Sequence, residues 1–349
     1  MRKKTIAVLF GGCSSEYDVS LQSASAVIFG IDTKKYETVL LGITREGAWY
    51  KYAGSVRQIQ NNTWMRHPSC VRALISPDRQ THGVLVMEDG SAVALHIDAA
   101  FPVLHGKNGE DGTVQGLLEM AGIPCIGCGV LSSAICMDKD IAHRLVEAAG
   151  IKVPASAVLR AHMPENEILN AVMALKYPLF VKPANAGSSF GISQVTELSQ
   201  LLRAAANAFG HDRKVVVEET VEGFEVGCAV LGSEDLVVGE VDEIELKDGF
   251  FDYTEKYTLQ TSKIHMPARI SPDTAARVKQ TAIMIYRALE CGGFARVDMF
   301  LTPQGDIVFN EVNTIPGFTA HSRYPGMLGG IGISFSDIVN TLIDRVVQP

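Results

Sequence analysis

The sequence predicts a protein of the α/β class that contains more than one domain. Runs of branched apolar residues, typical of buried strands, alternate with amphipathic helical patterns along almost the whole chain. The chain has 349 residues, more than one ordinary hydrophobic core holds. No fixed-period repeat, low-complexity tract or long linker separates these patterns. We therefore expect three consecutive units, over residues 1–122, 123–222 and 223–349.

The first unit has the pattern of a doubly wound, Rossmann-like domain, in which ligands bind beyond the strand ends. It opens with a buried strand, a glycine turn and a helix. Its expected elements are strand Thr5–Phe10, helix Val19–Phe29, strand Tyr36–Ile43, strand Ala99–Leu104 and a helix from about Thr113.

The second and third units are expected to be compact α+β structures. The boundary between the first two follows Gly122-Ile123-Pro124, where turn residues interrupt the pattern. The second unit is expected to contain helix Asp138–Ala149, strand Pro178–Pro183, strand Ile192–Val195, helix Glu197–Phe209 and strand Lys214–Glu219. The third is expected to contain strands Glu225–Leu231 and Val237–Glu245, helix Pro272–Leu289, strands Ala295–Leu301 and Asp306–Glu311, and a helix from about Ser334.

Charge and composition argue against several classes of protein. The net charge is −8 and the charges are interspersed, so no basic stretch predicts nucleic-acid binding. No window is apolar enough to span a bilayer, and Gly11-Gly12 ends the first apolar run too early for a signal peptide. We therefore expect a cytoplasmic protein. The seven scattered cysteines do not suggest a disulfide framework, and a structural role is favoured for Cys125 and Cys128 over redox chemistry or metal binding.

Two glycine-containing loops follow expected strands of the first unit. Glycines in Gly11–Glu16 let backbone N–H groups approach a ligand. Glu16 in this loop either binds a substrate ammonium group or complements the dipole of the next helix, and the local sequence leaves both open. The loop His105–Gly112 combines three glycines with four ionisable residues. This density favours a ligand site over a simple surface turn.

A lysine and a loop of small residues in the second unit point to phosphate binding. Lys182 lies near the end of a strand, and the loop Ala184–Gly191 offers backbone and hydroxyl donors. Lys139 is a plausible second cation, although alone it would be a solvated residue at a helix start. Gly187–Gly191 also fits the pattern Gly-x-Ser-x-Gly with Ser189 central. A strand is expected after it, however, where a serine hydrolase has a helix.

Acidic residues at strand ends complete the set of candidates. Glu218 and Glu219, followed by Val221 and Glu225, could face adenine and ribose, although these acids alone would be read as a solvated strand end.

Alternation along a strand puts Arg296 and Asp298 on one face, and likewise Glu311 and Asn313. If the two strands pair as a hairpin, the four side chains converge. Their hard oxygen atoms suit Mg²⁺, and the arginine suits developing negative charge, which favours a metal site over a salt-bridge cluster.

In this order the motifs resemble those of D-alanine–D-alanine ligases, and the resemblance spans nearly the whole chain. The series is Gly11-Gly12-x-x-x-Glu16, His105-Gly-x-x-Gly-Glu-Asp-Gly112, Met137-Asp-Lys139, Val181-Lys182-Pro183, Gly187-Ser-Ser189, Arg296-x-Asp298 and Glu311-x-Asn313-Thr-x-Pro-Gly317. The resemblance implies the ATP-grasp fold. Phe250–Tyr257 and His321–Pro325 resemble most the VanG type of vancomycin-resistance ligase, which makes D-alanyl-D-serine.

The resemblance also implies roles for individual residues. The catalytic residues would be Glu16, Ser188, Tyr257, Arg296 and Gly317, with Glu16 on the ammonium of the first D-alanine and Arg296 and the Gly317 backbone as oxyanion site. ATP would be bound by Lys139, Lys182, Ser189, Glu218, Glu219, Val221, Glu225, Lys256 and Asn310. Two Mg²⁺ ions, or Mn²⁺, would be held by Asp298, Glu311 and Asn313. The amino acids would contact Glu16, His105, Asp242, Phe251, Ser322 and Arg323. Residues 246–262 would form a mobile loop that closes over ATP.

We therefore expect an ATP-dependent ligase that forms D-alanyl-D-serine through D-alanyl phosphate, for peptidoglycan precursors and vancomycin resistance. Such ligases are often homodimers. The alternatives are a D-alanine–D-alanine ligase of ordinary cell-wall synthesis, another ATP-grasp carboxylate–amine ligase, and a nucleotide-binding regulatory protein without catalysis. The expected preference for D-serine rests on Arg323 and Asp242, because polar groups in a pocket would be left unpaired by a methyl group.

Overall fold

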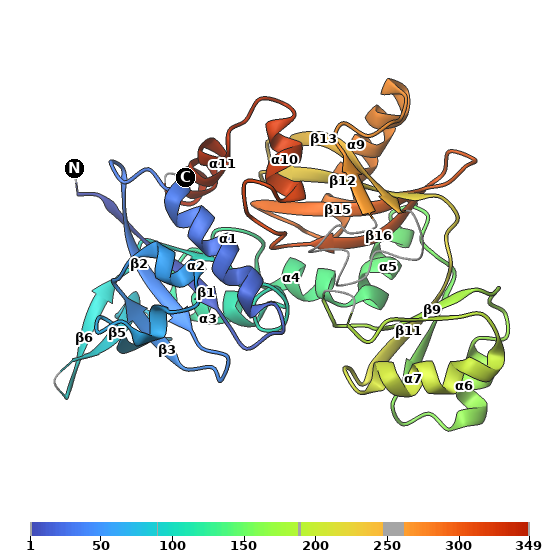
Figure 1. Ribbon diagram of the computed structural model, residues 1–349, viewed down its shortest axis with the longest axis horizontal. Coiled ribbons are helices and arrows are strands. Elements are labelled where there is room, and N and C mark those ends of the chain that lie inside the picture. The colour runs from blue at the N-terminus through green and yellow to red at the C-terminus, as the bar shows by residue number, and fades with distance from the viewer. Residues whose placement is uncertain (1, 89, 188–189, 247–261, 348–349) are drawn as a thin grey trace.

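The computed structural model describes residues 2–88, 90–187, 190–246 and 262–347, and three β-sheets organise this part of the chain (Figure 1). Each sheet uses a consecutive stretch of sequence. In Figure 1 the first sheet lies at the left, the third at the upper right, and the second below the third. The strands of each sheet fall inside one predicted unit, whereas the unit boundaries themselves stay a prediction.

The first sheet has a parallel centre. β1 pairs in parallel with β2 on one side and with β7 on the other, and it is buried on both faces from Thr5 onward. Burial on both faces explains its continuous apolar run, because a parallel strand under helices has no solvent side. The strands are β1 (Lys4–Gly11), β2 (Tyr36–Ile43), β3 (Trp49–Tyr52), β4 (Val71–Ile75), β5 (Gly83–Glu88), β6 (Ser91–His96) and β7 (Ala99–Pro102), in the order β6-β5-β4-β3-β2-β1-β7.

The parallel strands agree with the predicted Rossmann-like unit, but the antiparallel extension β3 to β6 was not predicted. Nearly every residue of β6 is exposed although residues 92–95 are apolar, and this short run lacks the alternation of apolar with polar residues that indicates a strand. The first sheet is accompanied by α1 (Tyr17–Gly30), α2 (Val56–Gln60), the short 3-10 helix η1 (Trp64–Arg66) and α3 (Thr113–Ala121).

The second and third sheets are antiparallel throughout. The second has the order β10-β9-β11-β8 and contains β8 (Ser156–Arg160), β9 (Leu179–Pro183), β10 (Ser193–Val195) and β11 (Lys214–Glu219). The third has the order β14-β13-β12-β15-β16 and contains β12 (Phe224–Leu231), β13 (Val237–Leu246), β14 (Ser262–His265), β15 (Phe294–Leu301) and β16 (Ile307–Asn313). The antiparallel pairing of β15 with β16 confirms the hairpin that the sequence predicts for these two strands.

The remaining helices cover these sheets and connect them. They are α4 (Val130–Met137), α5 (Lys139–Ala148), α6 (Glu165–Ala171), η2 (Leu198–Gln200), α7 (Leu201–Phe209), α9 (Pro272–Ala288), α10 (Arg323–Gly329) and α11 (Phe335–Val347). The helix predicted over Glu197–Phe209 is therefore divided into η2 and α7. In the described residues no helix combines the length and apolar character needed to cross a membrane.

The last helix, α11, packs against the first sheet and against α1, although it follows the strands of the third sheet in the chain (Figure 1). Its buried residues Ile338 and Leu342 share one hydrophobic cluster with Val8 of β1 and Leu21 of α1. Asn340 of α11 also donates from Nδ2 to the carbonyl at the end of α1, over 2.9 Å. The core of the first unit is thus completed by the C-terminal segment.

An aromatic cluster fills the other side of that core. Trp64 is fully buried, and its ring lies 5.0 Å from that of Phe10 and 6.1 Å from that of Tyr52. The indole N–H donates to the Tyr17 hydroxyl over 3.0 Å. Gly42 of β2 faces the indole so closely that a Cβ there would lie 2.4 Å from a Trp64 ring atom. The cluster therefore requires glycine at position 42.

Gly42→Ala should consequently destabilise the protein. The methyl group would overpack the Trp64 site and lower the free energy of unfolding by about 2 kcal/mol. Gly116→Ala is the matched control, since nothing lies within 4 Å of a Cβ there. In the α3 helix it should be neutral or stabilise by about 1 kcal/mol. Chemical denaturation of both variants measures the difference, and equal stabilities would contradict the packing argument.

Candidate active site

A large cavity opens between the second and third sheets. It has a volume of about 570 Å³, within the range of roughly 300–1,000 Å³ usual for small-molecule sites. Its walls come from β9, β11, β12, β13 and β16, together with the start of α5. We call it the larger cavity. Seven of the residues predicted to bind ATP line it: Lys139, Lys182, Glu218, Glu219, Val221, Glu225 and Asn310.

The positive charge of Lys182 in the larger cavity is balanced by the buried carboxylate of Glu218. Lys182 Nζ donates to Glu218 Oε2 over 2.6 Å, and His143 Nδ1 lies 4.0 Å from the other carboxylate oxygen. Burial raises the pKa of Glu218, but the charges of Lys182 and His143 outweigh burial and hold it below its ordinary value. Glu218 Oε1 is buried without a hydrogen-bond partner among the described residues. A hydrogen-bond acceptor without a partner suits a ligand that brings a donor.

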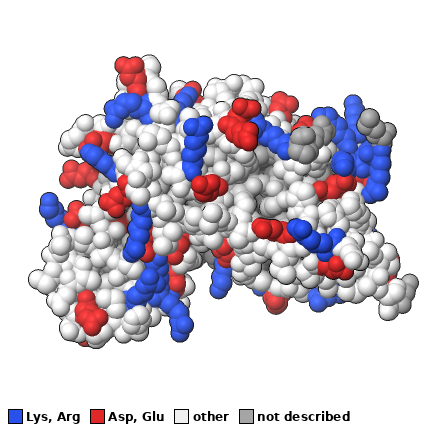
Figure 2. Space-filling model, turned by 180° about the vertical axis from the view of Figure 1, so that it is seen from behind, with Lys and Arg blue, Asp and Glu red and all other residues white. Residues whose placement is uncertain are grey.

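On the back face of the molecule, by contrast, basic and acidic side chains are interspersed (Figure 2).

Ion pairs on both sides of Lys139 hold it at the cavity. Lys214 of β11 binds Asp138 over 2.7 Å and Asp140 over 2.5 Å, and these acids flank Lys139 in the chain. The Asp138 side chain also caps α5 by accepting from the Ile141 N–H. The first turn of α5 is thereby tied to the second sheet. Lys139 Nζ donates to the Ala186 carbonyl over 3.0 Å, so it reaches the loop after β9.

A smaller cavity, of about 50 Å³, shares Lys139 and Glu311 with the larger one. Lys139 Nζ lies 3.8 Å from Glu311 Oε2, so these two side chains form the wall between the cavities. Glu16 and Glu110 line the smaller cavity as well. A group bound in one cavity would therefore face a group bound in the other across a single lysine and a single carboxylate.

Glu16 points into the smaller cavity rather than capping α1. It stands at the N-cap position, but its side chain makes no cap hydrogen bond. A Cβ at Gly106 would lie 2.4 Å from Glu16 Oε2, and one at Gly187 would lie 2.8 Å away. Glycine at both positions thus makes room for this carboxylate. Of the two interpretations left open by the sequence, this placement favours the ligand-binding one.

The β15–β16 hairpin brings the predicted metal ligands together. Asp298 pairs with Glu311 and Arg296 with Asn313, and the pair of Val297 with Val312 lies between them in the ladder, so the four side chains share one face of the sheet. Asn313 Nδ2 donates to Asp298 Oδ2 over 2.9 Å, and Arg296 holds the same carboxylate with bonds of 2.7 to 3.0 Å. No group of three His, Cys, Asp or Glu side chains suited to a metal occurs in the described residues. The donor set is therefore two carboxylates and one amide, which fits a hard divalent cation.

Arg323 lies buried among three carboxylates. Its Nε and Nη2 atoms donate to Asp242 over 2.7 and 2.8 Å, and Nη1 donates to Glu225 over 2.8 Å. Nη2 also lies 3.5 Å from Asp298. A Cβ at Gly227 would lie 2.4 Å from the guanidinium, so glycine there admits it. Arg323 therefore links Glu225 of the larger cavity to Asp298 of the hairpin, and its role toward a second substrate stays a prediction.

The other predicted substrate residues lie near the end of β16. His105 is buried, with Nδ1 2.8 Å from the Ile315 carbonyl oxygen and Nε2 2.9 Å from Ser23 Oγ. Burial lowers the pKa of His105 below its ordinary value. Ser322 begins α10, and its Oγ accepts from the Thr319 N–H over 3.0 Å. Ser188, Ser189, Phe251, Lys256 and Tyr257, and with them residues 247–261 of the predicted mobile loop, lie outside the described residues.

Two residues without an assigned role in the sequence analysis belong to this region. Burial, reinforced by the charge of Glu16, raises the pKa of Glu110 to about 8. Ser23 of α1 contacts both His105 and the Phe318 N–H. The motif around His105 could have indicated Glu110. Nothing in the sequence distinguishes Ser23 from other small residues of its helix.

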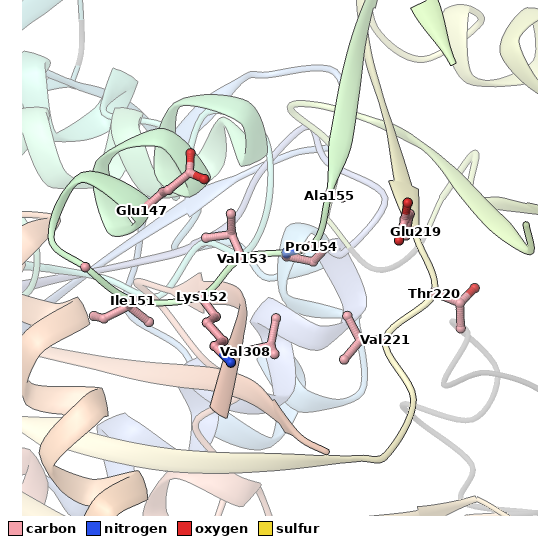
Figure 3. Close-up of a pocket in the computed structure, with 11 residues that line it drawn as sticks. Glu147, Ile151, Lys152, Val153, Pro154, Ala155, Glu219, Thr220, Val221 and Val308 are labelled. Atoms are coloured by element: carbon pink, nitrogen blue, oxygen red, sulfur yellow. The ribbon is translucent and has the colours of Figure 1, made fainter. Parts of the chain in front are cut away.

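A shallow pocket of about 500 Å³ adjoins the larger cavity (Figure 3). The two share Pro154, Glu219, Thr220 and Val221. In Figure 3 the segment that enters the second sheet, at Pro154–Ala155, runs beside the segment that leaves it, at Glu219–Val221. The Glu219 N–H donates to the Ala155 carbonyl over 2.9 Å. Both connections of the second sheet therefore border the larger cavity.

Comparison with known proteins agrees with this geometry. Residues 5–128 match the family described as D-ala D-ala ligase N-terminus, and residues 145–344 match D-ala D-ala ligase C-terminus. The chain belongs to the D-alanine–D-alanine ligase family. It is an ATP-dependent ligase, as predicted, and the family implies use of ATP and a divalent metal ion.

Several relatives match over nearly their full length. The resistance protein VanA of Enterococcus faecium is 43% identical over 98% of each chain. A D-alanine–D-alanine ligase of Caldicellulosiruptor bescii is 41% identical over 100% of this chain and 96% of its own. The crystal structure of the VanG D-Ala:D-Ser ligase from Enterococcus faecalis matches with a TM-score of 0.92 and 56% sequence identity. The match covers 98% of the present chain and 99% of the VanG chain. The predicted ATP-grasp fold is confirmed.

Removing the cation that ties α5 to β11 should destabilise the ligase in a pH-dependent way. Lys214→Met leaves two largely buried acids without their shared partner, at a cost of about 3 kcal/mol near neutral pH. Burial raises the pKa of Asp140, but Lys214 and Arg144 outweigh it and hold the pKa below its ordinary value. A carboxyl group whose pKa is lower in the folded than in the unfolded protein stabilises the folded state at pH values above its unfolded pKa. This stabilisation is lost as the pH falls through the folded pKa.

The difference between wild type and Lys214→Met should therefore be largest near pH 7 and shrink below about pH 4. Chemical denaturation across this range measures it. Lys152→Met removes an exposed ion pair with Asp306 and is the control, with an expected cost below about 1 kcal/mol. A difference that does not shrink as the pH falls below about pH 4 would show that these acids do not depend on Lys214.

Proposed function

We propose that this ligase joins D-alanine to D-serine through D-alanyl phosphate, using ATP and two Mg²⁺ ions, for which Mn²⁺ could substitute. The observation that carries the proposal is the pair of cavities that share Lys139 and Glu311. An acyl phosphate needs a nucleotide and a carboxylate substrate in adjacent, water-poor sites, which this arrangement supplies. The likeness to the VanG D-Ala:D-Ser ligase supports D-serine as the second substrate.

In this proposal the larger cavity binds ATP and the smaller one binds the first D-alanine. Lys182 and Lys139 contact the polyphosphate, and the backbone near Glu219 and Val221 meets the adenine. Glu16 holds the ammonium of D-alanine, which directs the carboxylate of that amino acid toward Lys139 and Glu311. The γ-phosphoryl group then passes to the carboxylate oxygen, and ADP leaves as the other product.

The hairpin next to both cavities serves the charged steps. Asp298, Glu311 and Asn313 would hold the divalent cations, which offset charge on the phosphates when bound. The amine of the second amino acid attacks the acyl carbon of D-alanyl phosphate, and Arg296 stabilises the tetrahedral oxyanion. The C–O bond to phosphate breaks, phosphate leaves and the new amide bond remains. The attacking amine loses a proton in this step.

The region proposed for the second substrate is polar. Asp242, Glu225 and Asp298 surround Arg323, and the residue before it in the chain is Ser322, which adds a hydroxyl group. The donors of Arg323 are engaged by carboxylates, so the serine hydroxyl would be met by Ser322, by carboxylate oxygens or through water. A methyl group would leave such groups unpaired. The relatives VanA and VanB are resistance proteins, and we assign the D-alanyl-D-serine product to the same role in peptidoglycan precursors. The homodimer stays a prediction.

D-Serine should outcompete D-alanine as acceptor. With D-alanine, ATP and Mg²⁺ supplied, kcat/KM for D-serine is expected to exceed that for D-alanine by about tenfold or more, because a site with hydroxyl partners rejects their absence. Ser322→Ala and Arg323→Lys should lower the ratio of kcat/KM for D-serine to kcat/KM for D-alanine. Arg323→Ala is less informative, since it leaves the fully buried carboxylate of Asp242 without its cationic partner. A wild type that prefers D-alanine would assign the protein to ordinary cell-wall synthesis instead.

Glu311→Gln should abolish ligation without unfolding the protein. The change keeps the size of the side chain but removes the charge shared by both cavities, and a loss of at least about 100-fold in kcat is expected. Glu222→Gln alters another acid of the larger cavity, one that is exposed and has no proposed role, and should keep activity. Phosphate release is measured against Mg²⁺ concentration. Near-wild-type turnover of Glu311→Gln would overturn the metal assignment.

A further inference from the structure

Two residues of the loop after β7 hold the backbone of one residue, Ile315, in the segment after β16. His105 Nδ1 lies 2.8 Å from the carbonyl oxygen of Ile315, and the N–H of Ile315 donates to Glu110 Oε1 over 3.0 Å. A carbonyl only accepts, so Nδ1 of His105 carries the proton and Nε2 accepts from Ser23. The backbone N–H and the backbone carbonyl of Ile315 are thus both bound by the first unit.

The second oxygen of Glu110 is also engaged. It accepts from the Gly106 N–H over 2.7 Å, which ties the carboxylate to its own loop. One side chain therefore bridges the backbone of the loop at Gly106 and the backbone after β16 at Ile315. Ser23 adds a neighbouring bond by accepting from the Phe318 N–H over 3.2 Å.

The segment held in this way connects two groups of the proposed reaction. Asn313 precedes Ile315 by two residues and is a proposed metal ligand, and Gly317 follows it by two and is the proposed oxyanion donor. The ladder between β15 and β16 ends at Asn313, so sheet hydrogen bonds no longer fix the backbone beyond it. A displacement of about 1 Å near reacting atoms can cost about 100-fold in rate. The backbone of this segment therefore needs hydrogen bonds from outside the sheet to hold its position.

We propose that Glu110 is a positioning residue for ligation, which fixes the backbone N–H of Ile315 and so the backbone from Asn313 to Gly317 against the loop that carries His105. The inference rests on the proposed function. It predicts that loosening this bond leaves the acyl phosphate formed but poorly aligned for the amine. Water then competes, and phosphate is released without a matching amount of dipeptide.

Glu110→Gln tests the inference at nearly constant volume. The amide nitrogen must face the N–H of either Gly106 or Ile315, so one of the two bonds is lost and two donors oppose each other. We expect phosphate released per dipeptide formed to rise at least about twofold and kcat for dipeptide to fall about 10- to 100-fold. Affinity for a non-hydrolysable ATP analogue should stay within about twofold of wild type, because Glu110 does not line the larger cavity.

Asp111→Asn is the matched control. The carboxylate of Asp111 accepts from the N–H groups of Asn108 and Thr113 and so supports the same loop without contacting Ile315. Its ratio of phosphate to dipeptide should stay near that of wild type. If Glu110→Gln does not fold, Ser23→Ala removes the neighbouring bond to Phe318 and is expected to raise the same ratio.

The outcomes separate the two proposals. A wild type that forms no dipeptide from ATP and D-amino acids would contradict the proposed function, whatever Glu110 does. A wild type that couples ATP use to dipeptide formation, with an unchanged ratio in Glu110→Gln, would overturn the positioning role alone. A ratio raised equally by Asp111→Asn would assign the effect to the loop as a whole and would also overturn it.

Discussion

The centre of the third sheet depends on a buried network of charges. Arg296 and Arg323 lie between the carboxylates of Asp298, Asp242 and Glu225. Each charge would be costly to bury alone, and removal of one member would leave its partners uncompensated. The network therefore sets the positions of all five side chains together. It spans from a wall of the larger cavity, at Glu225, to the β15–β16 hairpin that carries the proposed metal ligands, at Asp298.

Through this network, the proposed nucleotide site and the proposed carboxylate site are built on the same β-sheet. Glu225 belongs to β12, Asp298 to β15 and Glu311 to β16, and these strands are neighbours in one sheet. Lys139 reaches the same place from α5, which is anchored to the second sheet through Lys214. The proposed nucleotide and carboxylate sites are thus aligned by helices and strands rather than by loops alone, as accurate group transfer requires.

Local pattern explains what the sequence could predict. The strand β1, with its continuous apolar run, and the pairing of β15 with β16 were predicted, since period and burial are encoded locally. Seven residues of the larger cavity were found through motifs at strand ends. β6 was missed because its short apolar run, 92–95, shows no alternation of apolar with polar residues. The bonds of Arg323 to Glu225 and of Glu110 to Ile315 join positions 98 and 205 residues apart, for which one sequence holds no local signature.

The placement of α11 bears on how the chain matures on the ribosome. Domains of a multidomain protein generally fold as units, starting with the N-terminal one, while synthesis continues. Here Ile338 and Leu342 complete the core around Val8 and Leu21, and Asn340 binds the end of α1. The core around β1 and α1 therefore lacks Ile338 and Leu342 until those residues have been synthesised. A nascent chain that stops short of α11 exposes the apolar side chains that these two residues cover in the folded ligase.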